Sequence, residues 1–152
     1  MKTPATVTVA STRKGKVLRA FGDEMTVHLG GADTEGRLTV FTAVTPPGSG
    51  PPPHRHERED EWFFPLEGRV EFFLDGQWQE VPVGGVVFAG RGSVHTFRNV
   101  GTTPLKMLIH TSPAGFETYF ERCAEEFAKD GPPDMERIVQ ISLEHGLQFV
   151  DG

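Results

Sequence analysis

The 152 residues fit one domain that can bury its own hydrophobic core, and the single cysteine, Cys123, excludes an internal disulfide. The 21 acidic residues outnumber the 15 basic ones for a net charge of -6, and the longest basic cluster is Arg13, Lys14 and Lys16, so we expect no nucleic-acid partner. The N-terminus lacks the apolar core of a signal peptide and no stretch reaches the roughly 18 apolar residues of a membrane span, so we expect a soluble cytoplasmic protein without a membrane partner.

Short apolar runs of strand length fill the chain from about residue 5 to 111, separated by glycine, proline, aspartate and threonine. Apolar and polar side chains alternate in segments such as 25–29, 70–74 and 105–109, so each segment has one face to bury. No helix-length amphipathic pattern falls between these segments. We therefore expect an all-β architecture of antiparallel strands that form a sandwich or close into a barrel.

Two turns in this region predict hairpins. The dipeptide Asp75-Gly76 tolerates positive φ at both central turn positions, so the strand 70–74 should pair with the strand that follows it. The turn at 101–104 contains glycine, threonine and proline, and it predicts a second hairpin between the strands on either side of it.

Beyond the last strand the apolar period becomes helical. A helix of about 115–129 is predicted, with Ser112 as N-cap and Pro113 in the first turn, and a second helix begins at Asp134 and ends at Gly146. The apolar stripes are Phe116, Tyr119, Phe120, Cys123 and Phe127 in the first helix and Met135, Ile138, Ile141 and Leu143 in the second. Each stripe needs a cover, which the barrel or a partner subunit could supply.

Three histidines and one glutamate form a candidate metal site. His54 and His56 stand two residues apart on a predicted strand, so both imidazoles lie on one face, and Glu61 could reach the same ion across a turn. His95 could join them only through tertiary pairing. Nitrogen and carboxylate ligands suit a divalent first-row ion, and such a set leaves positions open for water, substrate or dioxygen. The alternative is that these histidines are unrelated.

The same residues resemble the two motifs of the cupin superfamily. The first motif reads Gly, five residues, His, one residue, His, four residues, Glu, six residues, Gly, and its residues here are Gly48, His54, His56, Glu61 and Gly68. The second reads Gly, five residues, Pro, one residue, Gly, two residues, His, three residues, Asn, and its residues here are Gly84, Gly90, Gly92, His95 and Asn99. One residue departs from the pattern, because Gly90 replaces the proline.

This resemblance implies a single domain over residues 1–152. Its expected parts are an antiparallel double-stranded β-helix (jelly-roll) barrel over about 5–111 and an extension with two C-terminal α-helices over about 112–152. The resemblance implies that His54, His56, Glu61 and His95 bind one divalent transition metal. Iron, manganese or nickel is favoured, while zinc, cobalt or copper would also fit these ligands. Homodimerisation is the family habit and is expected here.

The segment after the barrel is similar to the tail of small quercetinase-like cupins. That similarity implies a dioxygenase acting on a flavonol-like or other enolic or small aromatic substrate, with Glu61 as both ligand and catalytic base. Two other functions stay open: a metal-dependent isomerase, epimerase or lyase, and a non-enzymatic small-molecule binder. Nearby Glu57, Glu59 and Asp60 are interpreted as a solvated acidic turn, and His110 as a core or surface histidine.

Overall fold

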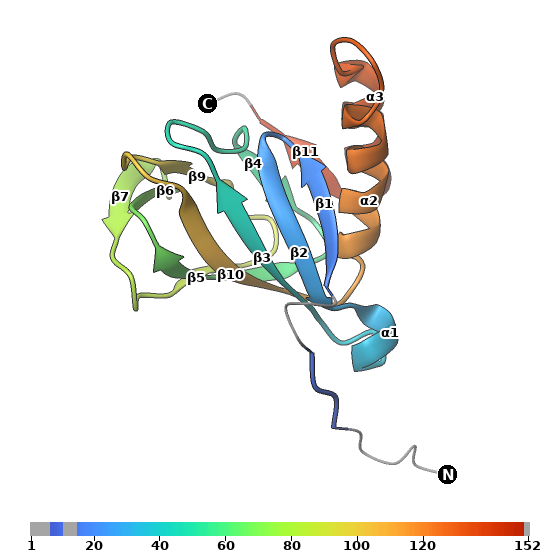
Figure 1. Cartoon of the computed structure of the whole chain (residues 1–152), viewed down its shortest axis with the longest axis horizontal. Coiled ribbons are helices and arrows are strands. Elements are labelled where there is room, and N and C mark those ends of the chain that lie inside the picture. Colours follow the sequence, from blue (N-terminus) through green and yellow to red (C-terminus); the bar gives the residue numbers. More distant parts are fainter. Residues whose placement is uncertain (1–6, 11–14, 151–152) are drawn as a thin grey trace.

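The computed structural model describes residues 7–10 and 15–150 (Figure 1). The strands are β1 (Lys16–Ala20), β2 (Asp23–Leu29), β3 (Thr39–Thr45), β4 (His54–His56), β5 (Asp60–Glu67), β6 (Val70–Leu74), β7 (Gln77–Val81), β8 (Val87–Ala89), β9 (His95–Asn99), β10 (Leu105–Ser112) and β11 (Leu147–Phe149). The helices are α1 (Gly31–Thr34), α2 (Phe116–Phe127) and α3 (Met135–Glu144). The predicted start of the barrel near residue 5 lies outside the described residues, as do Arg13 and Lys14.

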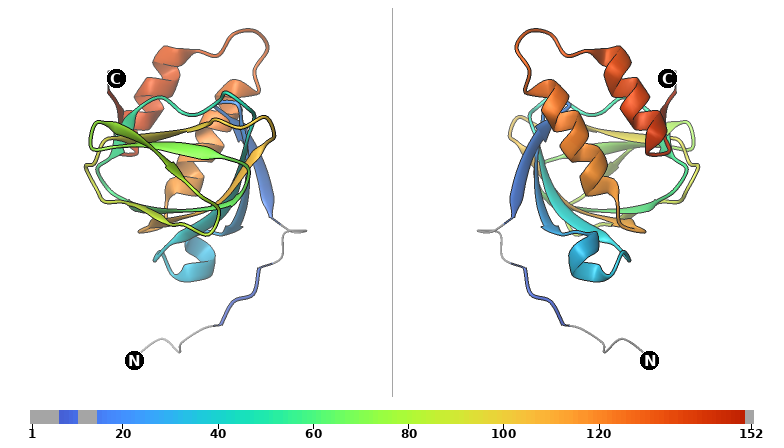
Figure 2. Two further views of the ribbon diagram at one scale, coloured as in Figure 1. Left: turned by 90° about the vertical axis from the view of Figure 1, so that its left-hand side faces the viewer. Right: turned by 90° about the vertical axis from the view of Figure 1, so that its right-hand side faces the viewer.

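The strands form two antiparallel sheets, as expected from their alternating pattern. The 6-stranded sheet has the order β1-β2-β3-β10-β5-β8, and the 5-stranded sheet has the order β11-β4-β9-β6-β7. The two sheets face each other, as in a jelly roll (Figure 2), and the hydrophobic core residues belong to both. Within residues 15–150 no strand pairing joins one sheet to the other, so the predicted closed barrel takes the form of two facing sheets.

One predicted hairpin is confirmed and the other is wrong. Asp75 (φ 50°) and Gly76 (φ 82°) occupy the left-handed region, and Leu74 pairs with Gln77 across the turn. The turn at 101–104 instead carries the chain from β9 in one sheet to β10 in the other. The turn residues indicate only that the chain changes direction. The long pairings of β10 with β3 and β5 decide which sheet β10 joins.

Helix α2 covers the β-sandwich. It lies across one end of the two sheets, with α3 beside it (Figure 2). Its stripe belongs to the hydrophobic core, so the barrel supplies the cover that the sequence left undecided. The predicted cap is wrong, because Ser112 is the last residue of β10 and Gly115, at φ 133°, precedes the helix. Because Phe116 in the first turn of α2 packs into the hydrophobic core, the N-terminus of this helix is held without a side-chain cap.

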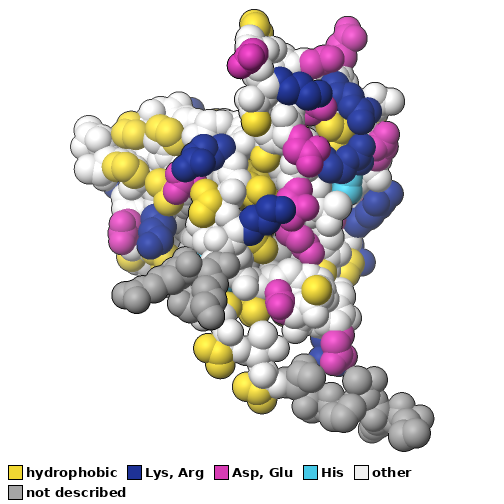
Figure 3. Space-filling view, turned by 45° about the vertical axis from the view of Figure 1, so that its right-hand side comes forward, with side chains coloured by type: hydrophobic (Ala, Val, Ile, Leu, Met, Phe, Trp, Pro, Cys, Tyr) yellow, Lys and Arg dark blue, Asp and Glu magenta, His cyan; other side chains and the backbone are white. Residues whose placement is uncertain are grey.

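The second helix divides its apolar residues between two faces. Ile138 and Ile141 are buried, whereas Met135 and Leu143 are exposed. The helix begins at Asp134, as predicted, and the Asp134 carboxylate caps it by accepting a hydrogen bond from the Arg137 backbone N–H at 3.1 Å. On the face shown in Figure 3, acidic and basic side chains alternate over the two helices. No helix of the described ranges has the length and apolar character needed to span a membrane.

The C-terminal extension contains a strand as well as the two expected helices. After α3, β11 pairs antiparallel with β4, and Leu147 and Phe149 stand opposite His56 and His54. The sequence did not indicate this strand, since three residues carry too little pattern. The strand completes the edge of the sheet that carries three of the predicted metal ligands.

Candidate metal centre

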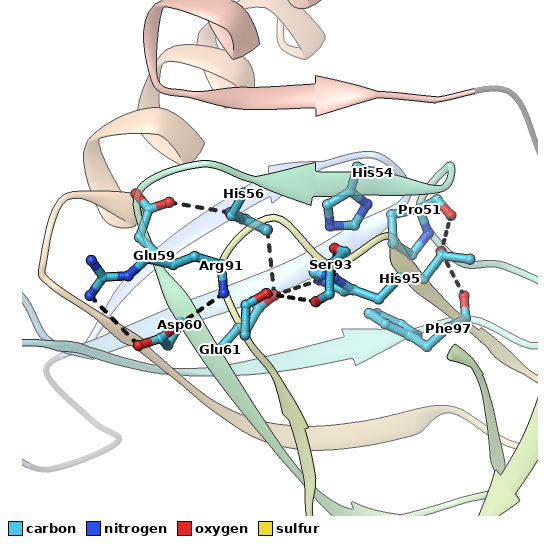
Figure 4. Close-up of polar contacts among 12 residues, drawn as sticks. Pro51, His54, His56, Glu59, Asp60, Glu61, Arg91, Ser93, His95 and Phe97 are labelled. Atoms are coloured by element: carbon cyan, nitrogen blue, oxygen red, sulfur yellow. Dashed lines mark hydrogen bonds and ion pairs between the residues drawn. The ribbon is translucent and has the colours of Figure 1, made fainter. Parts of the chain in front are cut away.

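Four predicted ligands meet inside the sandwich. His54 and His56 are buried on β4 with Arg55 pointing the other way, as the period of a strand requires. His95 on β9 pairs directly with His54 in the same sheet, whereas Glu61 reaches the group from β5 in the opposite sheet. Figure 4 shows the four side chains converging, and their candidate ligand atoms all lie within 4.8 Å of one another.

The Glu61 carboxylate holds the group together. Its Oε1 lies 3.1 Å from His95 Nε2 and 3.5 Å from His56 Nε2. The His54 ring centroid lies 4.7 Å from that of His95 and 5.1 Å from that of His56. All four residues are buried, with His54 the most exposed at 8%. This is a compact group of three imidazoles and one carboxylate shielded from water.

Backbone carbonyls orient two of the imidazoles. The Pro52 carbonyl oxygen lies 2.7 Å from His54 Nδ1, and the Ser93 carbonyl oxygen lies 3.0 Å from His95 Nδ1. A carbonyl can only accept, so each Nδ1 carries a proton, and Nε2 is the nitrogen that faces the cluster. Metal-binding histidines are held in this way, with the outer nitrogen donating and the inner nitrogen free for the ion.

A carboxylate orients the third imidazole. Glu59 is buried, at 7% exposure, and its Oε2 lies 3.3 Å from His56 Nδ1. The interpretation of Glu59 as part of a solvated acidic turn is therefore wrong. The chain after His56 curls back over the site, and the sequence held no signal for this except the spacing of three residues. Glu57, by contrast, is solvated and lies 3.5 Å from Arg55.

The contact with Glu59 predicts a loss of metal affinity in the Glu59→Gln protein. Such outer partners contribute roughly 10- to 100-fold to affinity, because a carboxylate fixes the ring and raises its basicity. Competition with a chromophoric chelator for Co²⁺ would measure the change. Glu57→Gln, on the same turn but solvated, is the control and should bind like wild type. Equal affinity in both variants would show that Glu59 has no such role.

The residues present fit a divalent transition metal. His56 Nε2 is buried without a hydrogen-bond partner in the described part of the chain, and such an atom is costly unless a further group binds it. An imidazole lone pair beside a carboxylate can be donated to a cation, so a metal ion would satisfy this atom. Three nitrogens and one oxygen form a mixed set that suits iron, manganese, cobalt, nickel, copper or zinc.

The pKa directions of His54 and Glu61 favour a bound cation, whereas that of His56 favours a proton. Burial, with the neighbouring His95 and His56, lowers the pKa of His54 to about 3, so its lone pair is available at neutral pH. Burial by itself would raise the pKa of Glu61. His56, His95 and His54 outweigh burial and lower the pKa below its ordinary value, so the carboxylate is ionised. Burial opposes protonation of His56, while Glu61 and Glu59 outweigh it and raise its pKa.

The turn before His95 is fixed despite the missing proline. The Ser93 backbone N–H donates to the Gly90 carbonyl at 3.1 Å, and the Ser93 hydroxyl donates to the same oxygen at 2.6 Å. The Gly92 N–H donates to the His56 carbonyl at 2.7 Å, which ties this turn to β4. Hydrogen bonds therefore supply the order that proline would supply in the motif.

A small cavity of about 60 Å³ adjoins the cluster. Its lining residues are Phe21, Asp23, Met25, Phe41, Ala43, Pro51, His54, Glu61, Phe63, Phe97, Ile109, Phe116, Tyr119, Phe120, Leu147 and Phe149. The space holds on the order of a few water molecules. Aromatic walls with a few polar groups are typical of a small-molecule site.

The remaining histidines of interest lie elsewhere. His110 is on the outer face of β10 and packs against Phe64, with ring centroids 5.3 Å apart. His28 contacts the Thr42 hydroxyl at 3.0 Å on the same outer surface. Cys123 is fully buried in the core, and burial raises the pKa of its thiol to about 11, so it is an unreactive hydrophobic residue.

One buried carboxylate in the cavity, that of Asp23, was not among the predicted site residues. Asp23 is 8% exposed, and its Oδ1 has no hydrogen-bond partner among residues 15–150. Burial raises the pKa of Asp23 to about 6, and the nearby Thr45 hydroxyl offsets this only in part. The sequence spacing could have indicated this burial. Asp23 stands two residues before the apolar Met25, and alternation along β2 puts both side chains on the inner face.

This shift predicts how stability varies with pH. Between the ordinary pKa of 3.8 and about 6, native Asp23 holds a proton that the unfolded chain has lost. Its contribution is therefore complete below pH 3.8 and is lost as the pH rises through about 6. Asp23→Asn cannot ionise, so it should gain roughly 3 kcal/mol over wild type between about pH 4 and pH 8. Urea denaturation across this range would measure it. Glu24→Gln, on the exposed face, should follow wild type, and parallel curves for all three proteins would contradict the shift.

The comparisons identify the class of protein. The family model described as "Cupin domain" matches residues 41–111, which include the four candidate ligands. With the two facing antiparallel sheets and both motifs present, the resemblance to the cupin superfamily is confirmed for this part of the chain: residues 41–111 match a cupin domain.

Particular relatives differ in what they do. The chain is 27% identical over 95 residues to quercetin 2,3-dioxygenase of Bacillus subtilis (62% of this chain, 28% of that protein). It is 36% identical over 63 residues to an oxalate-binding protein of Thermotoga maritima (41% and 52%). A crystal structure described as a predicted oxalate decarboxylase from the same organism has a TM-score of 0.65 at 24% identity (70% and 99%), a level that shows the fold alone. The matches span less than two thirds of the length of these curated relatives.

Proposed function

We propose that this protein is a metal-dependent oxidoreductase of the dioxygenase type that acts on a small enolic or aromatic molecule. The observation that carries the proposal is the convergence of three buried imidazoles and Glu61 at the wall of an aromatic cavity. The similarity to quercetin 2,3-dioxygenase supports the reaction type. Residues His54, His56, Glu61 and His95 would hold the ion.

A bound divalent metal would supply Lewis acidity and open positions for a substrate oxygen or dioxygen. The chain itself supplies the proton acceptor. Glu61 is ionised, is buried, and lines the cavity, so its carboxylate can accept the hydroxyl proton of an enol that enters there. The phenyl rings of Phe63, Phe97 and Phe116 line the same space and exclude water from the reacting group.

The cavity limits the size of the substrate. A volume of about 60 Å³ cannot hold a flavonol unless side chains move apart. A single-ring enol or a small aromatic alcohol needs less displacement. We therefore favour small enolic compounds over flavonols within the same reaction class.

Oxygen consumption tests the proposal directly. Protein loaded separately with Fe²⁺, Mn²⁺ or Ni²⁺ would be mixed with a panel of small enols and flavonols in an oxygen electrode. We expect substrate-dependent uptake with at least one metal, and none with the His56→Ala protein. If no metal gives uptake with any compound, the dioxygenase assignment is wrong.

A second function keeps the metal and dispenses with oxygen. The similarity to an oxalate-binding protein and the small cavity favour a site that binds or rearranges a small polar acid. In such an isomerase, lyase or binder, Glu61 would shuttle a proton or only hold the ion. Turnover of the same panel under nitrogen, followed by NMR of the products, would separate this function from the first.

The homodimer stays a prediction, as does the absence of nucleic-acid and membrane partners. The outer face of α3 carries Met135, Val139 and Leu143 with exposures of 47%, 41% and 56%. These residues are one helical turn apart and form a continuous apolar stripe. Light scattering should give twice the mass of the chain, and a monomer mass would contradict the prediction.

A further inference from the structure

The cavity has a second polar end, at Asp23. This residue follows the tight turn at Phe21 and Gly22, whose φ values are 54° and 80°, and its side chain enters the sandwich from β2. The carboxylate is nearly buried, and one of its oxygens meets no donor in the described structure. A buried carboxylate without a partner destabilises the fold, so its presence calls for a role.

Neighbouring groups do not satisfy Asp23. None of the described residues that line the cavity is lysine or arginine, and the polar ones besides Asp23 are His54, Glu61 and Tyr119. The Tyr119 hydroxyl is already paired with the Ser142 hydroxyl at 2.8 Å. Glu24, next in the chain, points outward and pairs with Arg19 at 3.0 Å. The Thr45 hydroxyl lies near the carboxylate but is itself buried without a hydrogen-bond partner among residues 15–150, so neither it nor the cavity lining satisfies the free Asp23 oxygen.

Asp23 and Glu61 lie at opposite ends of the strands of the 6-stranded sheet, near the start and near the end of β10. Asp23 lies one residue beyond the Glu24–Val44 pair, next to Thr45, which pairs with Leu105 at the start of β10. Glu61 pairs with Thr111, near the end of β10. Phe149 lies between the two regions, with its ring centroid 6.1 Å from that of Phe21 and 6.4 Å from that of His54.

Asp23 also borders the surface. Phe21 and Asp23 line both the cavity and a groove on the outside of the molecule, beside Ala124 and Phe127 of α2. A ligand that passes from this groove toward Glu61 would meet Asp23 first. We take this shared wall as the entrance of the cavity: it carries an acceptor, the other walls are aromatic, and the far end carries the candidate metal ligands.

We propose that Asp23 recognises the substrate at the entrance of the cavity by accepting a hydrogen bond from a hydroxyl or amino group remote from the metal centre. The substrate is then a small, flat and mainly apolar molecule with an enolic oxygen at one end and a hydrogen-bond donor at the other. The inference rests on the proposed function, because the enolic end is the one that approaches Glu61.

Matched probes that differ by one hydroxyl test this directly. Kojic acid and allomaltol share the same enolic ketone, and only kojic acid carries a hydroxyl at the opposite end of the ring; 3,4′-dihydroxyflavone and 3-hydroxyflavone form a longer pair. Calorimetric titration of Ni²⁺-loaded protein under nitrogen would give the four affinities. We expect the hydroxylated member of at least one pair to bind roughly 10- to 100-fold tighter, the range of a hydrogen bond to a charged group.

The Asp23→Leu protein should lose this preference while binding allomaltol within about threefold of wild type. Asp23→Leu binding that keeps the preference, or wild-type binding that shows none in either pair, overturns the role of Asp23 and leaves the proposed function standing. A wild-type protein that binds metal but none of the four probes counts against the proposed enolic substrate instead.

Stability of the metal-free protein then tests Asp23 by itself. Functional groups left unpaired for a ligand lower stability, so Asp23→Asn should melt roughly 3–8 °C above wild type at pH 8. An equal or lower melting temperature would mean that Asp23 supports the fold, and it would overturn the inference.

Discussion

His56→Ala protein is expected to bind divalent metal at least roughly 100-fold more weakly than wild type, a larger loss than removal of an outer partner causes. The substitution removes the imidazole whose Nε2 lies 3.5 Å from Glu61 and whose Nδ1 lies 3.3 Å from Glu59. Two buried carboxylates then lose the ring between them, so stability should fall as well. Elemental analysis after purification with added Fe²⁺, Mn²⁺ or Ni²⁺ would give near one ion per wild-type chain and close to none in the variant.

The control is His110→Ala. This histidine lies on the outer face of β10, away from the cluster, and should leave the metal content unchanged. A His56→Ala protein that retains a full equivalent of metal would show that the four side chains do not form the binding site. Loss of metal in both variants would indicate a general effect on folding.

Gly50→Ala is expected to destabilise the protein by roughly 3 kcal/mol or more. A Cβ atom at Gly50 would lie 2.0 Å from the Phe97 carbonyl oxygen and 3.1 Å from the Arg98 Cα. Both contacts are with backbone, so no side-chain rotation relieves them, and β9 must shift. Because β9 carries His95, we expect weaker metal binding together with a lower urea midpoint.

Gly90→Ala is the matched control. A Cβ atom there would meet only the Phe88 ring, at 3.5 Å, which is an ordinary contact. The variant should unfold within about 1 kcal/mol of wild type and keep its metal. If Gly50→Ala is equally stable, the segment before His54 does not constrain β9 as tightly as its approach to Phe97 indicates.

Local patterns in the sequence determined much of the fold and the core of the site. Alternation predicted the strands, Asp75-Gly76 predicted its hairpin, and the helical period predicted α2 and α3. A spacing of two residues placed His54 and His56 on one face, since successive side chains on a strand point to opposite sides. Glu61 followed from its reach across the turn after His56, and the motif spacing, rather than any local rule, brought His95 into the set.

Tertiary structure alone decided the rest. The destination of β10 after the 101–104 turn, the pairing of β11 with β4, the burial of Glu59 against His56 and the free oxygen of Asp23 all depend on partners distant in sequence. Short-range sterics fix the backbone shape of each segment, and that shape is written in neighbouring residues. Burial and pairing depend instead on which distant segments pack together. For an isolated Asp or Glu the sequence therefore gives the charge of the side chain but does not show whether the folded chain buries it.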